Sequence, residues 1–175
     1  MPAGKHLFEQ YNKNKIFFET GSYAGDGIQT ALDSDYEHVY SLELSIPHHE
    51  DCKTRFMGNQ KVTLLLGDSA ECLYDSIKNI NQNITFWLDG HYSCGKTAKG
   101  KYWSPLMQEL DAIQKHNIKT HTIIIDDMRY WSKDNPELNF GKQEIEEKIL
   151  EINKNYKITY HEGAVPNDIL VADIC

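Results

Sequence analysis

Acidic residues follow two of the apolar runs in this 175-residue sequence. Asp89 comes directly after the run ITFWL, and Asp126 and Asp127 come directly after the run TIII. If these runs form neighbouring parallel strands, all three carboxylates emerge at the carboxyl edge of the sheet, where open α/β sheets bind their ligands. Crowded carboxylates raise one another's pKa unless a cation lies between them. The residues therefore predict a site for Mg²⁺ or Mn²⁺ at Asp89, Asp126 and Asp127.

A glycine-rich segment, TGSYAGDG at residues 20–27, follows the first apolar run, KIFFE. Glycines suit a sharp turn between a strand and a helix, because the backbone can then approach a nucleoside closely. The spacing G-x-x-x-G-x-G differs from the G-x-G-x-x-G of dinucleotide sites, so a cofactor with a pyrophosphate is less favoured. The turn predicts a nucleoside site beside the carboxylates.

Two further carboxylates end the second and third apolar runs. Glu43 closes VYSLE, where an acid can accept hydrogen bonds from both hydroxyls of a ribose. Asp68 follows Leu66 and Gly67 just before a helix, where it could accept a hydrogen bond from the exocyclic amine of adenine. Each residue alone has a structural explanation, since Asp68 or Ser69 is also a good helix cap. Three such features in register favour a nucleoside ligand.

The elements that position these residues alternate between short β-rich runs and helix-length amphipathic segments, which is typical of βαβ units and a mostly parallel sheet. We expect strands at Lys15–Glu19, His38–Glu43, Lys61–Leu66, Ile84–Asp89, His121–Asp126, Lys157–His161 and Ile169–Ile174. We expect helices at Gly27–Asp33, Pro47–Met57, Ser69–Lys78, Pro105–His116 and Gln143–Asn153. The turn EGAVPND is too short for a helical crossover, so the last two strands should pair antiparallel.

Composition narrows the class of protein. The length suits one domain over residues 1–175, and 40% hydrophobic with 25% charged residues is close to the globular average. A net charge of −8 without a basic stripe argues against a nucleic-acid partner. The four cysteines lack the spacing of a zinc site or a disulfide scaffold, which favours the cytoplasm. The sequence shows neither a signal peptide nor a run long enough to span a membrane.

The segments FFETGSYAGDG, LELS and LLGDSAE together resemble three consecutive motifs of class I S-adenosylmethionine (SAM) dependent methyltransferases. The resemblance covers most of the first half of the chain. It implies a Rossmann-like α/β fold with strand order 3-2-1-4-5-7-6 and strand 7 antiparallel. It also implies a SAM site, with Glu19 and Gly21 near the amino-acid moiety, Glu43 near the ribose and Asp68 near the adenine. The full set of cofactor-binding candidates is Glu19, Thr20, Gly21, Ser22, Tyr23, Gly25, Glu43, Leu44, Gly67, Asp68, Ser69 and Asp89.

The segments WLDGH and IIIDDMR resemble the metal-dependent sugar O-methyltransferases of the macrocin O-methyltransferase group. That resemblance implies a divalent metal on Asp89, Asp126 and Asp127, with two vicinal hydroxyls of a sugar or glycan completing its shell. A base, His91 or Asp89, would take the hydroxyl proton. Histidine suits this task because its reference pKa is near neutral. The chain departs from the group in lacking the extra N-terminal segments and lids of its longer members.

The long irregular segment 90–104 and the residues after Asp127 are candidates for acceptor binding. Loops of this length are usually functional or mobile. Polar and aromatic side chains that could bind a sugar are Tyr92, Ser93, Lys96, Thr97 and Lys99. Candidates for a wall against which the C–H face of a sugar ring could pack are Trp103, Arg129, Tyr130 and Trp131. An exposed flap and an ordinary core or rim are the structural alternatives.

Three other functions stay open at this point. The acceptor could be catechol-like or a protein rather than a sugar or other small molecule. The chain could bind SAM or a nucleotide as a regulator without turnover. It could also act as a homo-oligomer, or as one domain of a larger glycan-building polypeptide. Fold alone does not choose among them.

Overall fold

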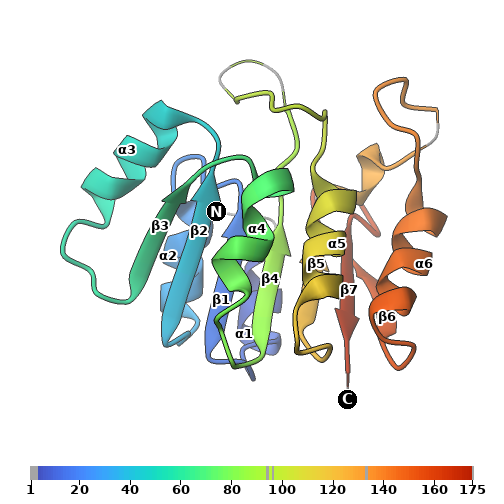
Figure 1. The fold of residues 1–175 in the computed structure, drawn as a ribbon, viewed down its shortest axis with the longest axis horizontal. Coiled ribbons are helices and arrows are strands. Elements are labelled where there is room, and N and C mark those ends of the chain that lie inside the picture. The colour runs from blue at the N-terminus through green and yellow to red at the C-terminus, as the bar shows by residue number, and fades with distance from the viewer. Residues whose placement is uncertain (1–3, 94, 96, 133, 175) are drawn as a thin grey trace.

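A computed structural model describes residues 4–93, 95, 97–132 and 134–174. The sheet has the order β3-β2-β1-β4-β5-β7-β6, as the resemblance implied. Its strands, in chain order, are β1 (Ile16–Thr20), β2 (His38–Glu43), β3 (Val62–Leu66), β4 (Ile84–Leu88), β5 (Thr122–Ile125), β6 (Lys157–His161) and β7 (Ile169–Asp173). The first five pair parallel, whereas β7 runs antiparallel to both β5 and β6 (Figure 1). The predicted fold class, strand order and antiparallel final pair are confirmed.

Helices cover both faces of this sheet. The helices α4 (Ser69–Ile77), α5 (Leu106–Lys115) and α6 (Lys142–Ile152) pack on the face that is nearer the viewer in Figure 1. The helices α1 (Lys5–Gln10), α2 (Asp26–Asp33) and α3 (Ile46–Arg55) contribute to the core on the opposite face. Successive strand residues alternate between the two cores, so that Phe17 packs with α1 and α2 and Phe18 with the other side. This three-layer arrangement leaves only the ends of the strands open to ligands.

Two short elements were not among the sequence predictions. The six-residue helix α1 buries Leu7 and Phe8, and the Phe8 ring lies 4.8 Å from Phe17 and 4.9 Å from Trp87 between ring centroids. A 3-10 turn, η1 (Met128–Tyr130), follows β5 directly. Tertiary contacts stabilise both elements. Neither has enough apolar residues in sequence to show a periodic pattern, and this is why neither was predicted.

The start of α5 is fixed by Ser104 and Pro105. Ser104 Oγ accepts a hydrogen bond from Leu106 N at 3.2 Å, and Pro105 lies where its missing N–H costs nothing. The residues before α5 therefore lead into a fixed helix, and in Figure 1 residues 97–104 lie above the carboxyl ends of the parallel strands. Among the described residues, no helix is both long and apolar enough to cross a bilayer.

Candidate active site

A cavity of about 460 Å³ lies at the carboxyl edge of the parallel strands. Ten of the residues predicted for the site line it: Gly21, Tyr23, Glu43, Leu44, Gly67, Asp68, Ser69, Asp89, His91 and Asp127. Five other predicted residues, Glu19, Thr20, Ser22, Gly25 and Asp126, are absent from its lining. The cavity thus spans the ends of β1 to β4 and reaches the turn after β5.

The glycine-rich turn approaches the end of β4 very closely. Gly21 has φ +86°, and a Cβ built on it would lie 2.6 Å from the carbonyl oxygen of Asp89. A side chain there would be strained by the positive φ and would also push the two strand ends apart. Glycine at this position keeps the backbone of β1 and β4 together as one wall of the cavity.

The Glu43 carboxylate is held in place by backbone groups. Its Oε2 accepts from Tyr23 N at 2.9 Å, and its Oε1 accepts from Ser45 N at 2.7 Å. Each oxygen keeps a second lone pair for a further donor. A carboxylate fixed in this way can accept from two neighbouring hydroxyl groups without first being reorganised.

Asp68 caps α4 and also contacts the long loop. Its Oδ1 accepts from Ala70 N at 2.9 Å, and Lys101 N lies 3.4 Å from its Oδ2. A Cβ on Gly100 would be 2.5 Å from the same Oδ2. The cap and the ligand interpretations of Asp68 are therefore compatible, and the loop lies against the carboxylate that was assigned to adenine.

Glu19 lies beneath the glycine-rich turn. It is buried, its Oε2 accepts from Ser41 Oγ at 2.6 Å, and its other oxygen is packed against the Cα of Gly27. Burial raises the pKa of Glu19 to about 8, although the hydrogen bond from Ser41 lowers it. A neutral, hydrogen-bonded acid in this place supports the turn from below.

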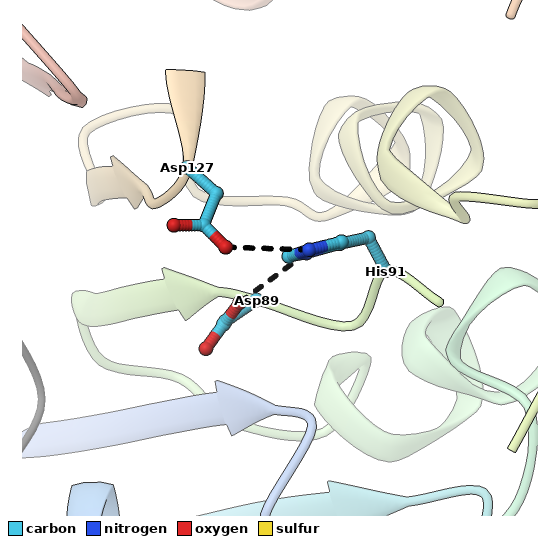
Figure 2. A group of neighbouring side chains, drawn as sticks. All are labelled: Asp89, His91 and Asp127. Atoms are coloured by element: carbon cyan, nitrogen blue, oxygen red, sulfur yellow. Dashed lines mark ion pairs between the residues drawn. The ribbon is translucent and has the colours of Figure 1, made fainter. Parts of the chain in front are cut away.

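His91 lies between two carboxylates at the other end of the cavity. Its Nδ1 is 3.4 Å from Asp89 Oδ1, and its Nε2 is 3.2 Å from Asp127 Oδ2 (Figure 2). Burial lowers the pKa of His91, but the hydrogen bond and charge of Asp89, with the charge of Asp127, outweigh it and raise the pKa overall. One ligand atom from each of the three residues lies within 4.8 Å of the others.

Asp126 belongs to a different group of side chains. Its Oδ1 accepts from Asp127 N at 2.7 Å, and it clusters with Asp127 and Asp168 instead of with Asp89. Burial and the charge of Asp89 raise the pKa of Asp126 to about 7. The three predicted carboxylates are thus neighbours, but the structure divides them between two clusters that share Asp127.

Asp168 and Arg129 organise the turn after β5, and sequence analysis did not assign a role to Asp168. Its buried carboxylate accepts from Arg129 N at 3.0 Å and from Ala164 N at 3.1 Å, and it pairs with the Arg129 guanidinium. The same guanidinium lies 2.6 Å from Asp127 Oδ1. Asp127 itself has φ +59°, a conformation that costs energy for a residue with a Cβ. These contacts fix the carboxylate that faces His91.

Aromatic rings surround His91. The ring centroids of Trp103, Tyr130 and Trp131 lie 5.5, 5.4 and 5.8 Å from that of His91. Trp131 is buried and donates through Nε1 to the carbonyl of Asp126, so it belongs to the core, whereas Tyr130 is exposed. Of the predicted loop residues, Tyr92, Ser93 and Thr97 line the cavity, and Lys96 lies outside the described residues.

Several solved structures that resemble this chain are methyltransferases. An O-methyltransferase from Bacillus cereus in complex with S-adenosylhomocysteine (SAH) has a TM-score of 0.64 at 14% identity, over 99% of this chain and 81% of that one. The O-methyltransferase TomG from Streptomyces achromogenes, in complex with SAM, has a TM-score of 0.64 at 10% identity, over 97% and 77%. The chain has the class I methyltransferase fold. SAH-bound PaMTH1 from Podospora anserina, another methyltransferase of this fold, has a TM-score of 0.61 at 11% identity, over 98% and 77%.

No model of a known protein family matches the sequence, and no curated protein matches it either. At these identities the similarity of this class I methyltransferase fold to the solved structures concerns architecture. The reaction that the chain catalyses depends on the residues of the cavity and does not follow from the fold.

Proposed function

We propose that the chain is a SAM-dependent O-methyltransferase. The observation that carries this proposal is one cavity with a glycine turn and two carboxylates, Glu43 and Asp68, at one end and His91 between Asp89 and Asp127 at the other. The first end suits a nucleoside, and the second suits removal of a proton. In methyl transfer the two must share one space, because the acceptor oxygen attacks the methyl group in line.

The resemblance to class I methyltransferases implies the roles of the cofactor residues, and the contacts in the cavity support them. Glu43 would accept from the two ribose hydroxyls, and Asp68 would accept from the adenine amine in place of Lys101 N. Gly21 and Asp89, whose backbones meet at the ends of β1 and β4, would border the amino-acid moiety. When bound, SAM supplies an electrophilic methyl group on a positively charged sulfur. The residues Glu19, Thr20, Ser22 and Gly25 would support this wall from behind.

His91 is the proposed general base. It would take the proton of the acceptor hydroxyl, which would free the acceptor oxygen to attack the methyl group that bound SAM would supply. Asp89 and Asp127 then stabilise the protonated imidazole from its two sides. Arg129 holds Asp127 in this position, so the base has a fixed orientation before the acceptor arrives.

A divalent cation, Mg²⁺ or Mn²⁺, is a further part of the proposal. The side chains that could hold it form two groups that share Asp127, one with Asp89 and His91 and one with Asp126 and Asp168, so an ion on Asp89, Asp126 and Asp127 would require Asp89 or Asp126 to turn toward the other. Asp89, Asp126 and Asp127 would supply the oxygen ligands. The ion would lower the pKa of an acceptor hydroxyl. Arg129 pairs with Asp127 and would compete with the ion for this carboxylate, so the experiment below compares turnover with and without Mg²⁺.

A sugar or glycan is the proposed acceptor. Trp103 and Tyr130 present rings beside His91, and a sugar packs its C–H face on such rings while its hydroxyls meet polar groups. A catechol-like acceptor would use the same rings, so the diol is the shared chemistry. The second candidate, a SAM-binding regulator without turnover, would need the nucleoside end of the cavity alone.

The experiment that tests this function is transfer of a labelled methyl group from SAM to a panel of sugars, a catechol and a protein mixture, with EDTA and with added Mg²⁺. We expect labelled product from a sugar in Mg²⁺ and less in EDTA. Labelled catechol alone would change the acceptor, and equal turnover in EDTA would remove the metal. SAH binding with no labelled product from any acceptor would favour the regulator.

A further inference from the structure

One buried acid near the cavity has no role in the chemistry above. Glu109, in the first turn of α5, is only 1% exposed, and its Oε1 has no hydrogen-bond partner among the described residues. An unpaired buried polar atom costs on the order of 1–3 kcal/mol of stability. An apolar side chain would fill this place without that cost, so the acid calls for a functional explanation.

The Glu109 carboxyl lies directly behind the cavity wall. A Cβ built on Gly90 would be 3.2 Å from Glu109 Oε1 and 3.4 Å from Ser69 Oγ. Gly90 and Ser69 both line the cavity, whereas Glu109 does not. Thr20 Oγ1, at the end of β1, is a second buried oxygen without a partner in the described part of the chain. The acid therefore lies where the ends of β1, β4 and α4 meet.

These three ends carry the backbone of the proposed nucleoside site. Ser69 begins α4 next to Asp68, and Gly90 follows Asp89 at the end of β4. From α5, a helix that otherwise packs into the core, the Glu109 side chain borders the Gly90 position, which Ser69 Oγ also borders. A shift of the carboxyl would therefore disturb the cavity wall at Gly90 and beside Ser69.

The protonation state of Glu109 suits a contact with hydroxyl groups. Burial raises its pKa to about 7, the hydroxyls of Ser69 and Thr20 lower it, and the charges of Asp68 and Asp89 raise it further. A protonated carboxyl offers both a donor and an acceptor, whereas a carboxylate only accepts. Near neutral pH the side chain can therefore serve a hydroxyl in either direction without placing another full charge beside Asp68 and Asp89.

We propose that Glu109 is a positioning residue for the cofactor, which holds Ser69, beside the adenine end of the SAM site, and the Asp89–Gly90 turn, beside its amino-acid end, at the spacing that SAM requires. The assignment rests on the proposed SAM site and adds a residue to it that does not touch the ligand. It predicts that affinity for the cofactor and stability of the fold respond differently when Glu109 is replaced.

Two substitutions separate these effects. Glu109→Leu replaces the acid with an apolar side chain of similar size and so removes both carboxyl oxygens. We expect at least tenfold weaker SAH binding in this variant, with a melting temperature equal to or above that of the wild type. Glu109→Gln keeps a neutral donor and acceptor, and we expect SAH binding within about twofold of the wild type. Calorimetric titration with SAH and thermal unfolding measure the two quantities. Glu146→Leu, which replaces an acid on α6 that pairs with Tyr160, is the matched control and should leave SAH binding unchanged.

Wild-type SAH affinity in Glu109→Leu would overturn the assignment, and so would a Glu109→Gln variant that binds as weakly as the Leu variant. If Glu109→Leu does not fold, Ser69→Ala takes its place, because the Ser69 hydroxyl and Glu109 Oε1 border the same Gly90 position. Unchanged affinity in Ser69→Ala would then overturn the proposal. Failure of the wild type to bind SAH would overturn the proposed function and this assignment together, whereas normal binding by both wild type and Glu109→Leu overturns this assignment alone.

Discussion

At Glu43, backbone N–H groups and the proposed ligand use the same carboxylate oxygens. Both of its oxygens already accept a backbone hydrogen bond, from Tyr23 and Ser45. It can still bind a ribose, because each oxygen has a second lone pair that faces a different direction. Its role in ligand binding can therefore be measured on the purified chain without knowledge of the acceptor.

We predict that Glu43→Ala weakens SAH binding by about 1–3 kcal/mol, since two hydrogen bonds to a charged group are lost. That loss corresponds to roughly five- to 150-fold in the dissociation constant. Titration calorimetry measures it, with Glu37→Ala as a control on an exposed acid that pairs with Lys15 before the same strand. SAH affinity equal to the wild type in Glu43→Ala would remove the ribose assignment.

A second prediction at this scale concerns Asp168. The residue is fully buried, and its carboxylate binds both the backbone N–H and the guanidinium of Arg129. Asp168→Asn removes this negative charge and leaves the guanidinium paired with Asp127. We expect a loss of about 3–5 kcal/mol of unfolding free energy, as for one partner of a buried pair. Urea unfolding measures it, and Asp75→Asn, in the exposed pair with Lys78, should leave the midpoint unchanged. An unchanged midpoint in Asp168→Asn would show that the clamp contributes no stability.

At the scale of the elements, two histidines join the ends of α4, α5, β4 and β5 far from the cavity. His121 Nδ1 accepts from Ile84 N at 3.0 Å, and its Nε2 lies 2.9 Å from His116 Nδ1. His116 Nε2 is 3.1 Å from the carbonyl oxygens of Ile77 and Ile80. This pattern is satisfied when both rings are neutral, with the proton on Nε2 in each.

The pair predicts a loss of stability in acid. Burial lowers the pKa of His121 to about 3 from its ordinary 6.5, so the unfolded chain binds more protons than the folded one between these values. The contribution of His121 to stability should therefore fall as pH drops below about 6.5, with a slope approaching about 1.4 kcal/mol per pH unit. The raised pKa values of Glu19, Glu109 and Asp126 act in the opposite direction, so the prediction concerns the difference between wild type and variant. In urea unfolding between pH 7 and pH 4.5, His121→Asn should lose less stability, or gain more, than the wild type as pH falls, and His6→Asn, at an exposed position, should follow the wild type; an equal pH dependence in His121→Asn and the wild type would contradict the assignment.

Periodicity predicted the elements that alternate clearly between apolar and polar residues, and it missed those that depend on the rest of the chain. The strands were found because their residues pack into cores on both faces, as Phe17 and Phe18 do. The helix α1 was missed because only Leu7 and Phe8 are buried, and their partners, such as Trp87, are distant in sequence. The tight turn at Met128–Tyr130 was missed for the same reason.

For the whole molecule, the site also has a part that sequence patterns predict and a part that depends on tertiary contacts. The glycine turn and the acids that end β2, β3 and β4 could be predicted, because one rule of α/β sheets places them at one edge. The contacts of Asp168 with Arg129 and of Glu109 with the Gly90 turn could not, since they join segments whose distance only the folded chain sets. The division of Asp89, Asp126 and Asp127 between two clusters also depends on side-chain orientation at the end of β5.

The measurement that tests the central claim most directly is calorimetric titration of the wild-type chain with SAH, first in EDTA and then in millimolar Mg²⁺. The proposed hydrogen bonds to the cofactor come from Glu43 and Asp68, which lie outside the Asp89, His91 and Asp127 cluster, so we predict micromolar binding in both buffers. No binding in either buffer would contradict a SAM site in this cavity.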